Sequence, residues 1–303
     1  MNNKVVIVGC GNVGMSYAYA LVNQKTYVSD LVLIDINTEK TIGEVMDLNH
    51  CLPYTPSKMN IKVGSYSDCK DAKIVVIAAG ANQKEGETRM DLIYKNASIF
   101  DSIIKSIKSS GFDGIYLIAT NPLDVMTYLT LKYSGTTPNK VIGTGAALDT
   151  ARLRYLLSEE LNLCPKDIDA YVIGEHGDSE FIPWSNANVG FKKITDLLSK
   201  KKLDKIEEKV RNSAYEVIKR KGATSYGIGA TMVRITNAIL EDKKIILSVS
   251  SYDKIRDVCI STPTIVDING VREKINFPMT KEENEKLSSS IKIIKDAIKK
   301  VLK

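Results

Sequence analysis

The chain has 303 residues, of which 44% are hydrophobic and 26% are charged, which is ordinary for a globular protein with a sizeable core. No run of about 18 apolar residues and no basic-then-apolar N-terminal segment occurs, which argues against a membrane-spanning or secreted protein. The net charge of +6 at pH 7 comes largely from lysine-rich stretches such as 200–209 and 292–303, which we expect to be solvated helix faces rather than a nucleic-acid site.

The first half of the chain alternates short apolar runs with helical patterns. We predict strands at 5–9, 31–35, 61–63, 74–78, 115–119 and 141–143, with helices between several of them, for example at 13–23 and 92–109. Strands rich in Val and Ile without polar alternation are typical of strands buried on both faces. The pattern therefore predicts an α/β fold with a Rossmann-type, doubly wound parallel sheet.

The second half has a different, mixed pattern. We predict helices at 147–161, 199–219, 224–241 and 281–302, and short strands at 169–173, 245–249, 258–260 and 264–267. We expect two domains in close contact, a nucleotide-binding domain at 1–143 and a mixed α+β domain at 144–303. The cleft between them is the expected site.

The segment after the first predicted strand fits the GxGxxG pattern, with Gly9, Gly11 and Gly14 as its glycines. Gly9 would permit a tight turn, Gly11 would let the main chain approach a pyrophosphate, and Gly14 would let helix and strand pack closely. The first helical residues, Asn12 and Val13, would present free N–H groups to the phosphates.

Asp35 ends the next predicted strand, where a carboxylate accepts hydrogen bonds from the adenosine ribose and repels a 2′-phosphate. Strand, glycine turn, helix and acid together predict NAD rather than NADP as the cofactor. The alternative is a glycine-rich turn and a strand-ending Asp that coincide by chance, and we consider it the weaker interpretation.

Two segments carry candidate groups for proton transfer and anion binding. His176, one of only two histidines, lies in the Gly-flanked turn 173–179 and suits proton transfer, although a packed or surface histidine is the alternative. Asp149 and Arg152 are three residues apart and share one face of a predicted helix. An Asp can orient an imidazole and an Arg can bind a carboxylate through two parallel hydrogen bonds, although a local surface pair is also common.

Two polar loops follow buried strands. The loop 80–89 has Gly80 and Gly86 as flexible points, and its closure could carry Arg89 into the site, although it could equally be an ordinary surface loop. In the other loop, 119–124, Asn121 could bind a substrate oxygen or only form a turn.

In combination, GEHGDS (174–179), LDTAR (148–152), NQKEGETR (82–89) and TNPLD (120–124) resemble the L-lactate/malate dehydrogenase family, in its bacterial lactate-dehydrogenase branch. The resemblance covers nearly the whole chain, in order. It implies that NADH donates a hydride to the carbonyl carbon of pyruvate while His176 donates a proton to the oxygen, with Asp149 as its partner. No metal is implied.

The resemblance also implies the remaining roles. Arg152 would bind the substrate carboxylate, and Arg89 would polarise the carbonyl when the loop closes. Asn121 would form a hydrogen bond nearby, ahead of a cis bond to Pro122. Two positions in 222–228 match positions beside the substrate and the nicotinamide: Thr224 and Ile228.

Gln83 matches the family position that meets the substrate side chain, where malate dehydrogenases have Arg. A neutral Gln leaves a second carboxylate unpaired in a water-poor site, which favours pyruvate over oxaloacetate. Two alternatives stay open, a malate dehydrogenase and an L-2-hydroxyisocaproate-type dehydrogenase. The hydroxyisocaproate alternative stays open because the segment 248–263 is short and the segment 222–229 tolerates some change of shape. The compact loop 82–89 argues for lactate instead.

Regulation and assembly are also implied by the resemblance. Many bacterial relatives bind fructose 1,6-bisphosphate between subunits through an Arg and a His. Arg154 matches the Arg, but Asp169 stands at the position of the His, and carboxylate–phosphate repulsion predicts weak or absent activation. The family implies a homo-oligomer, a tetramer or a dimer with the same contacts.

Five scattered cysteines without a CxxC pair favour a reducing, cytoplasmic location and no zinc site. A non-enzymatic NAD-binding protein of the same fold is the remaining functional alternative. It gives little reason for the presence together of the catalytic and substrate-binding residues named above.

Overall fold

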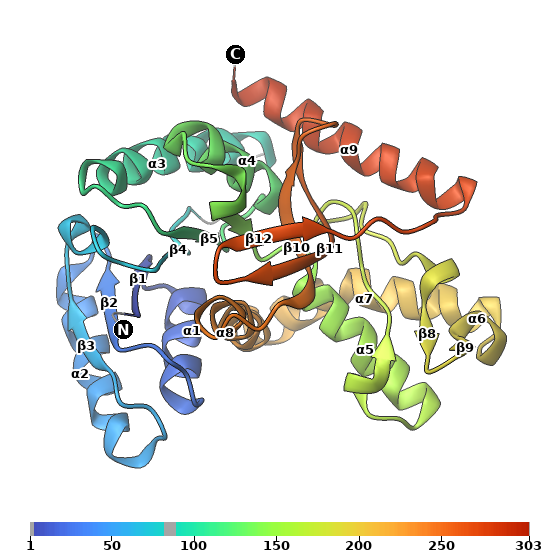
Figure 1. Cartoon of the computed structure of the whole chain (residues 1–303), viewed down its shortest axis with the longest axis horizontal. Helices are drawn as coiled ribbons and strands as arrows, with labels where there is room; N and C mark the ends of the chain where they lie inside the picture. Colours follow the sequence, from blue (N-terminus) through green and yellow to red (C-terminus); the bar gives the residue numbers. More distant parts are fainter. Residues whose placement is uncertain (1–2, 82–88, 303) are drawn as a thin grey trace.

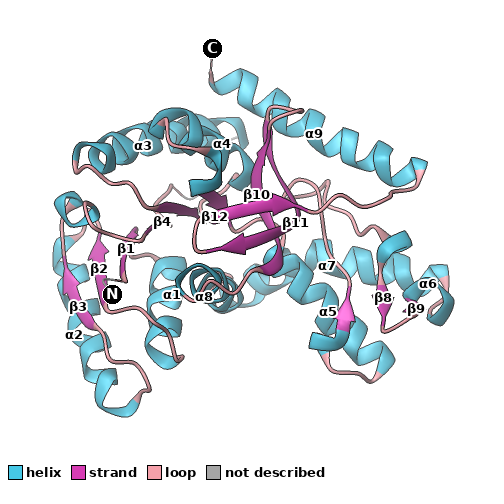
Figure 2. Ribbon diagram, viewed as in Figure 1, coloured by secondary structure: helices cyan, strands magenta, loops and turns pink. Residues whose placement is uncertain are grey.

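The computed structural model describes residues 3–81 and 89–302, with residues 89–91 described as main chain only. Its centre is a sheet in which six parallel strands follow the order β6-β5-β4-β1-β2-β3 (Figures 1 and 2). These strands are β1 (Lys4–Val8), β2 (Asp30–Ile34), β3 (Asn60–Val63), β4 (Ile74–Ile77), β5 (Ile115–Ile118) and β6 (Val141–Gly143). The predicted doubly wound parallel sheet is confirmed, and its order reverses between β1 and β4, where such folds bind ligands.

Helices cover both faces of this sheet (Figure 1). One face packs against α1 (Asn12–Asn23) and α8 (Tyr226–Leu240), while α2 (Thr38–Cys51) lies beside β3. The other face packs against α3 (Arg89–Ser109), α4 (Leu123–Ser134) and α9 (Lys281–Val301). The alternate side chains of each strand thus enter two separate apolar clusters, which explains why β1 is apolar from Val5 to Val8.

The second half of the chain extends the same sheet with three antiparallel strands, β10 (Ile245–Asp253), β11 (Val258–Asp267) and β12 (Gly270–Lys274). β10 pairs with β6 at Ser250 and Gly143, so the sheet is continuous from one half to the other. The predicted strands 258–260 and 264–267 are parts of one longer strand, and β12 lies where no strand was predicted. Pro263 lies inside β11, at the end of the β11–β12 ladder, where its carbonyl accepts from Ile275 N–H at 2.8 Å.

A third apolar cluster belongs to residues 146–210 alone and packs α5 (Ala147–Leu161) against α7 (Lys200–Lys221). Beside it lie α6 (Ile194–Leu197) and a small sheet of β7 (Ile168–Asp169), β8 (Asn188–Val189) and β9 (Lys192–Lys193). The predicted strand 169–173 was wrong, since only two residues form β7. Ile173 instead bridges to Phe181 and fixes the ends of a loop.

Five short 3-10 helices complete the described elements: Leu52–Tyr54, Tyr66–Cys69, Pro138–Lys140, Pro165–Asp167 and Trp184–Asn186. None of the described helices is both long enough and apolar enough to cross a membrane. The division of the chain after residue 143 stays a prediction, because two of the apolar clusters contain residues from both sides of it.

Candidate functional site

The glycine turn after β1 has a shape that side chains would prevent. Gly9 has φ +104°, and a Cβ there would lie 2.4 Å from the main-chain nitrogen of Ala79. A Cβ on Gly14 would lie 1.9 Å from the carbonyl oxygen of Gly9. Both positions therefore require glycine, so that β1, its turn and α1 pack closely.

The start of α1 offers a site for an anion. The N-cap is Gly11, which has no side chain to bond the first N–H groups of the helix, and a Cβ at Gly11 would meet no atom within 4 Å. Uncapped N–H groups and the positive end of the helix dipole face this open space, beside exposed Asn12 and half-buried Val13. A dinucleotide pyrophosphate fits these features.

Asp35 lies directly beyond β2 and contacts the glycine turn. Its Oδ2 accepts a hydrogen bond from the N–H of Cys10 at 2.7 Å, and its Oδ1 accepts one from the N–H of Asn37 at 3.0 Å. A carboxylate has about four acceptor positions, so the ribose hydroxyls can still bind. Asp35 thus also positions the turn itself, a contact that the sequence motif did not reveal.

His176, Asp149 and Arg152 are brought together as a chain of contacts. Asp149, on α5 and only 1% exposed, accepts from His176 Nδ1 through its Oδ2 and from Arg152 Nη1 through its Oδ1, both at 2.7 Å. The Asp149 carboxylate therefore fixes the ring of His176 through Nδ1, which leaves Nε2 for a substrate. Arg152 keeps its other N–H donors for an anion.

The electrostatics of this group favour a protonated His176. Burial alone would lower the pKa of the imidazole, but the charge and hydrogen bond of Asp149 outweigh it and raise the pKa of His176 to about 9. Burial would raise the pKa of Asp149, and the charges of His176 and Arg152 lower it below its ordinary value. At neutral pH the site therefore contains an imidazolium, a carboxylate and a guanidinium.

Asp124, the last residue of the TNPLD motif, anchors the loop that carries His176. This buried carboxylate accepts from the N–H of His176 at 2.7 Å and from the hydroxyl of Ser250 at 2.6 Å. Burial raises its pKa to about 6. Sequence reasoning missed this contact, although the motif had drawn attention to the position.

These groups surround one cavity of about 240 Å³. Four of the predicted site residues line it: Asn121, Asp149, Arg152 and His176. Its lining also includes residues that sequence reasoning missed: Glu180 from the His176 loop and, from α7, Arg211, Tyr215 and Ile218. The cavity has the size and charge for a small carboxylic acid.

The Asn121–Pro122 peptide bond is cis, as the resemblance implied. The carbonyl oxygen of Asn121 accepts from Asn96 Nδ2 at 2.8 Å, and Asn96 Oδ1 in turn accepts from the N–H of Ala81 at 2.8 Å. The amide of Asn96 on α3 thus joins the loops that follow β4 and β5.

Other predicted site residues lie elsewhere. Thr224 lies half-buried between α7 and α8, and Ile228 on α8 packs against the apolar cluster on one face of the sheet. Neither lines the His176 cavity as described. Arg89 begins α3, but its side chain lies outside the described parts of the chain, as does all of Gln83. Their roles stay predictions.

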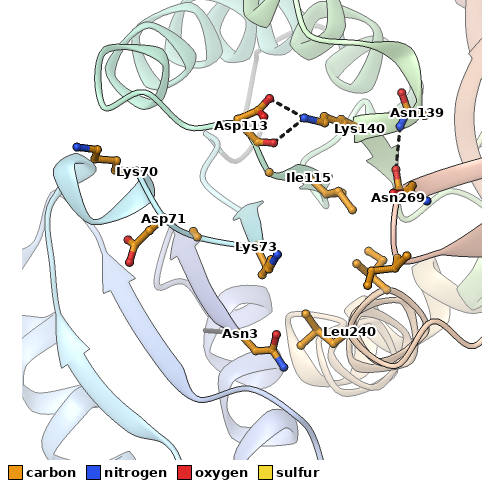
Figure 3. A pocket seen from close by; sticks show the side chains of 14 residues that line it. Asn3, Lys70, Asp71, Lys73, Asp113, Ile115, Asn139, Lys140, Leu240 and Asn269 are labelled. Carbon is orange, nitrogen blue, oxygen red and sulfur yellow. Dashed lines mark hydrogen bonds and ion pairs between the residues drawn. The ribbon is translucent and has the colours of Figure 1, made fainter. Parts of the chain in front are cut away.

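A larger cavity, of about 660 Å³, lies at the amino ends of the parallel strands β4 and β5 (Figure 3). Its labelled side chains include Lys73 and Ile115, at the amino ends of β4 and β5, and a Lys140–Asp113 ion pair. Nucleotide sites in open α/β sheets lie at the carboxyl ends of the strands. We therefore assign the functional site to the smaller cavity, where the groups that can transfer a proton are found.

Arg154 lies apart from this site, on another face of α5. Its Nε donates to the carbonyl of Ala170 at 3.0 Å, and its guanidinium stacks on the ring of Tyr171 at 4.8 Å. Asp169 is exposed at the end of β7, next to this stack. Asp169 and Arg154 both interact with Tyr171.

Two family models match the chain. The lactate/malate dehydrogenase NAD binding domain matches residues 3–143, and the lactate/malate dehydrogenase alpha/beta C-terminal domain matches residues 146–303. The L-lactate dehydrogenase of Halalkalibacterium halodurans is 50% identical over 299 residues, which are 97% of this chain and 96% of that protein. L-lactate dehydrogenase 1 of Bacillus cereus (strain ATCC 10987 / NRS 248) is 48% identical, with 99% and 98% covered.

Solved structures give the same picture. A lactate dehydrogenase enzyme from a Medee basin deep-sea metagenome library matches with a TM-score of 0.97 at 48% identity, over 100% of this chain and 99% of that chain. The minor L-lactate dehydrogenase from Enterococcus mundtii, in its ligands-bound form, matches with a TM-score of 0.97 at 42% identity, over 99% and 98%. The likeness thus extends over nearly the whole chain.

Proposed function

The chain belongs to the lactate/malate dehydrogenase family, and from this premise we propose that it is an NAD-dependent L-lactate dehydrogenase, which interconverts pyruvate and L-lactate. The observation that carries the proposal is the contact of His176 with Asp149, and of Asp149 with Arg152, beside one small cavity. A lone histidine would support little. An imidazole aligned by a buried carboxylate, next to a guanidinium with N–H donors left over, supports proton transfer to a bound carboxylic acid.

The residues around the turn after β1 fit the cofactor that the family uses. Gly11 and the N-terminus of α1 would bind its pyrophosphate, and Asp35 its adenosine ribose. When bound, NADH supplies the hydride that the reaction needs. Asn121 and Ile228 are proposed to border its nicotinamide end.

The chain's own residues account for the remaining chemistry. Arg152 binds the carboxylate of the 2-keto acid and fixes its orientation in the cavity. His176 Nε2 donates its proton to the keto oxygen, which becomes the hydroxyl of lactate, and Asp149 stabilises the imidazolium before the transfer. In the reverse direction the neutral imidazole accepts the hydroxyl proton. Arg89 is proposed to polarise the carbonyl and Thr224 to border the substrate.

Gln83 is proposed to select pyruvate, and its replacement by Arg tests this. We expect the wild type to have a kcat/KM for pyruvate at least about 10²-fold above that for oxaloacetate, because a second carboxylate would lack an ionic partner. Gln83→Arg should raise kcat/KM for oxaloacetate relative to pyruvate. The measurement is NADH consumption with pyruvate, oxaloacetate and 2-ketoisocaproate.

The control variant is Gln24→Arg, which adds the same charge at an exposed position. An unchanged oxaloacetate-to-pyruvate ratio in Gln83→Arg would remove the assigned role. A wild type that prefers oxaloacetate would be a malate dehydrogenase, and one that prefers 2-ketoisocaproate would be a hydroxyisocaproate-type dehydrogenase. No turnover of any of the three would favour a non-enzymatic NAD-binding protein.

We further propose that fructose 1,6-bisphosphate activates this enzyme weakly or not at all at neutral pH. Asp169, which replaces the family's His and interacts with the same Tyr171 as Arg154, supports this, because its carboxylate would repel a phosphate. The KM for pyruvate should change less than about twofold when the sugar bisphosphate is added. A large fall in KM would contradict this. The homotetramer and the cytoplasmic location are proposed from the family alone.

A further inference from the structure

Glu180 is a buried carboxyl group that the proposed mechanism does not use. It is 6% exposed and lies four residues after His176 in the same loop. Its N–H donates to the carbonyl of Gly177 at 3.1 Å, and its own carbonyl accepts from Arg211 at 3.4 Å. The main chain of Glu180 is therefore fixed at both ends, and its side chain lines the His176 cavity.

The Glu180 carboxyl lies next to another carboxyl. One ligand-type atom each of Asp149, His176 and Glu180 all lie within 4.8 Å of one another. Asp149 already accepts from both His176 and Arg152, whereas no Lys or Arg side chain in 3–81 or 92–302 forms an ion pair with the Glu180 side chain. If Asp149 and Glu180 were both ionised, two buried negative charges would share the cations that already contact Asp149. This arrangement is unfavourable.

The groups that face this cluster come from four parts of the fold. They are Asp149 and Arg152 on α5, Arg211 and Tyr215 on α7, Asp124 on α4, and Glu175, His176 and Asp178 in the loop itself. Arg211 is directed elsewhere, to Glu207 Oε1 and to the main chain. Burial, and next the charge of Asp149, raise the pKa of Glu180 to about 9.

We propose that Glu180 is a positioning residue for His176: at neutral pH it lies beside Asp149 as a neutral acid, and at alkaline pH it gives up its proton in place of the imidazolium. The inference rests on the proposed function, because it concerns the same reaction. With Glu180 neutral, the cavity keeps the excess positive charge of His176 and Arg152 for an anionic substrate. When Glu180 ionises, its charge stabilises the proton on His176, so the two groups titrate as a coupled pair.

The spacing of Asp149, His176 and Glu180 would also suit a metal ion. However, Arg152 Nη1 and His176 Nδ1 already bond the two oxygens of Asp149, and a cation there would face the Arg152 guanidinium. The charges around the cluster therefore favour a proton on Glu180 over a metal.

Glu180→Gln separates this role from a structural one. It keeps the shape of the side chain and removes only its ionisation. We expect kcat/KM for pyruvate at pH 7 to stay within about threefold of the wild type, because the neutral acid has a neutral replacement. The alkaline midpoint of kcat/KM should fall by about half a pH unit or more, since a nearby charge, within 4.8 Å of the His176 ring, no longer supports the imidazolium.

A second readout does not need turnover. Infrared difference spectra of wild type against Glu180→Gln should contain the C=O band of a protonated carboxyl at pH 7, and this band should decline as the pH approaches 10. Glu180→Asp keeps an ionisable group, so its activity at alkaline pH should lie between that of Glu180→Gln and that of the wild type. Glu208→Gln, the same change at an exposed position of α7, should alter neither readout.

Two results would overturn the proposal. An absent protonated-carboxyl band at pH 7 would show that Glu180 is ionised there, and an unchanged alkaline midpoint in Glu180→Gln would show that it does not act on His176. If pyruvate is not the substrate, the infrared result still decides the protonation state, so failure of the two proposals can be told apart.

Discussion

Replacing His176 with Gln is expected to lower kcat for pyruvate reduction by about 10²- to 10⁴-fold, the usual contribution of a positioned general acid. Gln can occupy the ring position and accept or donate hydrogen bonds, but it cannot donate a proton to the keto oxygen. The cavity would keep Arg152, so pyruvate should still bind. The measurement is steady-state NADH oxidation at pH 7, with NADH binding followed separately by fluorescence titration.

The chain offers a matched control for this variant, because its only other histidine, His50, is exposed at the end of α2. His50→Gln should retain wild-type kcat. Retention of more than about a tenth of the activity in His176→Gln would mean that another group or water donates the proton. Loss of NADH binding in that variant would instead point to damage to the fold.

Asp149→Asn is expected to lower kcat/KM for pyruvate by about 10²- to 10³-fold at pH 7. The Asp149 charge is what raises the pKa of His176 to about 9 against the opposing effect of burial. Without that charge, the largest effect that opposes burial is lost, and the pKa of His176 falls towards or below its ordinary value of about 6.5. The neutral ring then dominates at pH 7, and the Asn side chain can bond the wrong tautomer.

The direction of the shift gives this variant a signature. Because the imidazolium returns as the pH is lowered, the deficit of Asp149→Asn in pyruvate reduction should shrink between pH 7 and pH 5.5. Lactate oxidation needs the neutral ring and should be less affected at pH 7. Asp167→Asn, at an exposed position, is the control. A deficit of equal size at every pH would indicate distortion rather than a changed pKa.

Much of the fold could be predicted from local patterns. The helix at 147–161 was predicted with the bounds that α5 has, because its apolar period and its ends are both marked in the sequence. The parallel strands followed from runs of Val and Ile that only a sheet covered on both faces can bury. The β10–β12 extension could not be predicted, since the contact of Ser250 with Gly143 joins segments more than a hundred residues apart.

The candidate site divides in the same way. Motifs named His176, Asp149 and Arg152, because each motif has its own local spacing. The contact of Asp124 with the N–H of His176 spans 52 residues, and no local period indicates it. Glu180 lies in an irregular loop, so its distance of four residues from His176 gave no reason to place it beside Asp149.

The pH dependence of kcat/KM for pyruvate reduction by the wild type, with saturating NADH, is the most direct test of the pairing between His176 and Asp149. The pairing predicts a rate that is level through neutral pH and declines only at alkaline pH, with a midpoint near the value of about 9 to which Asp149 raises the pKa of His176. A decline centred at about pH 6.5 or below would mean that the imidazole titrates as a free histidine does, and would contradict the account.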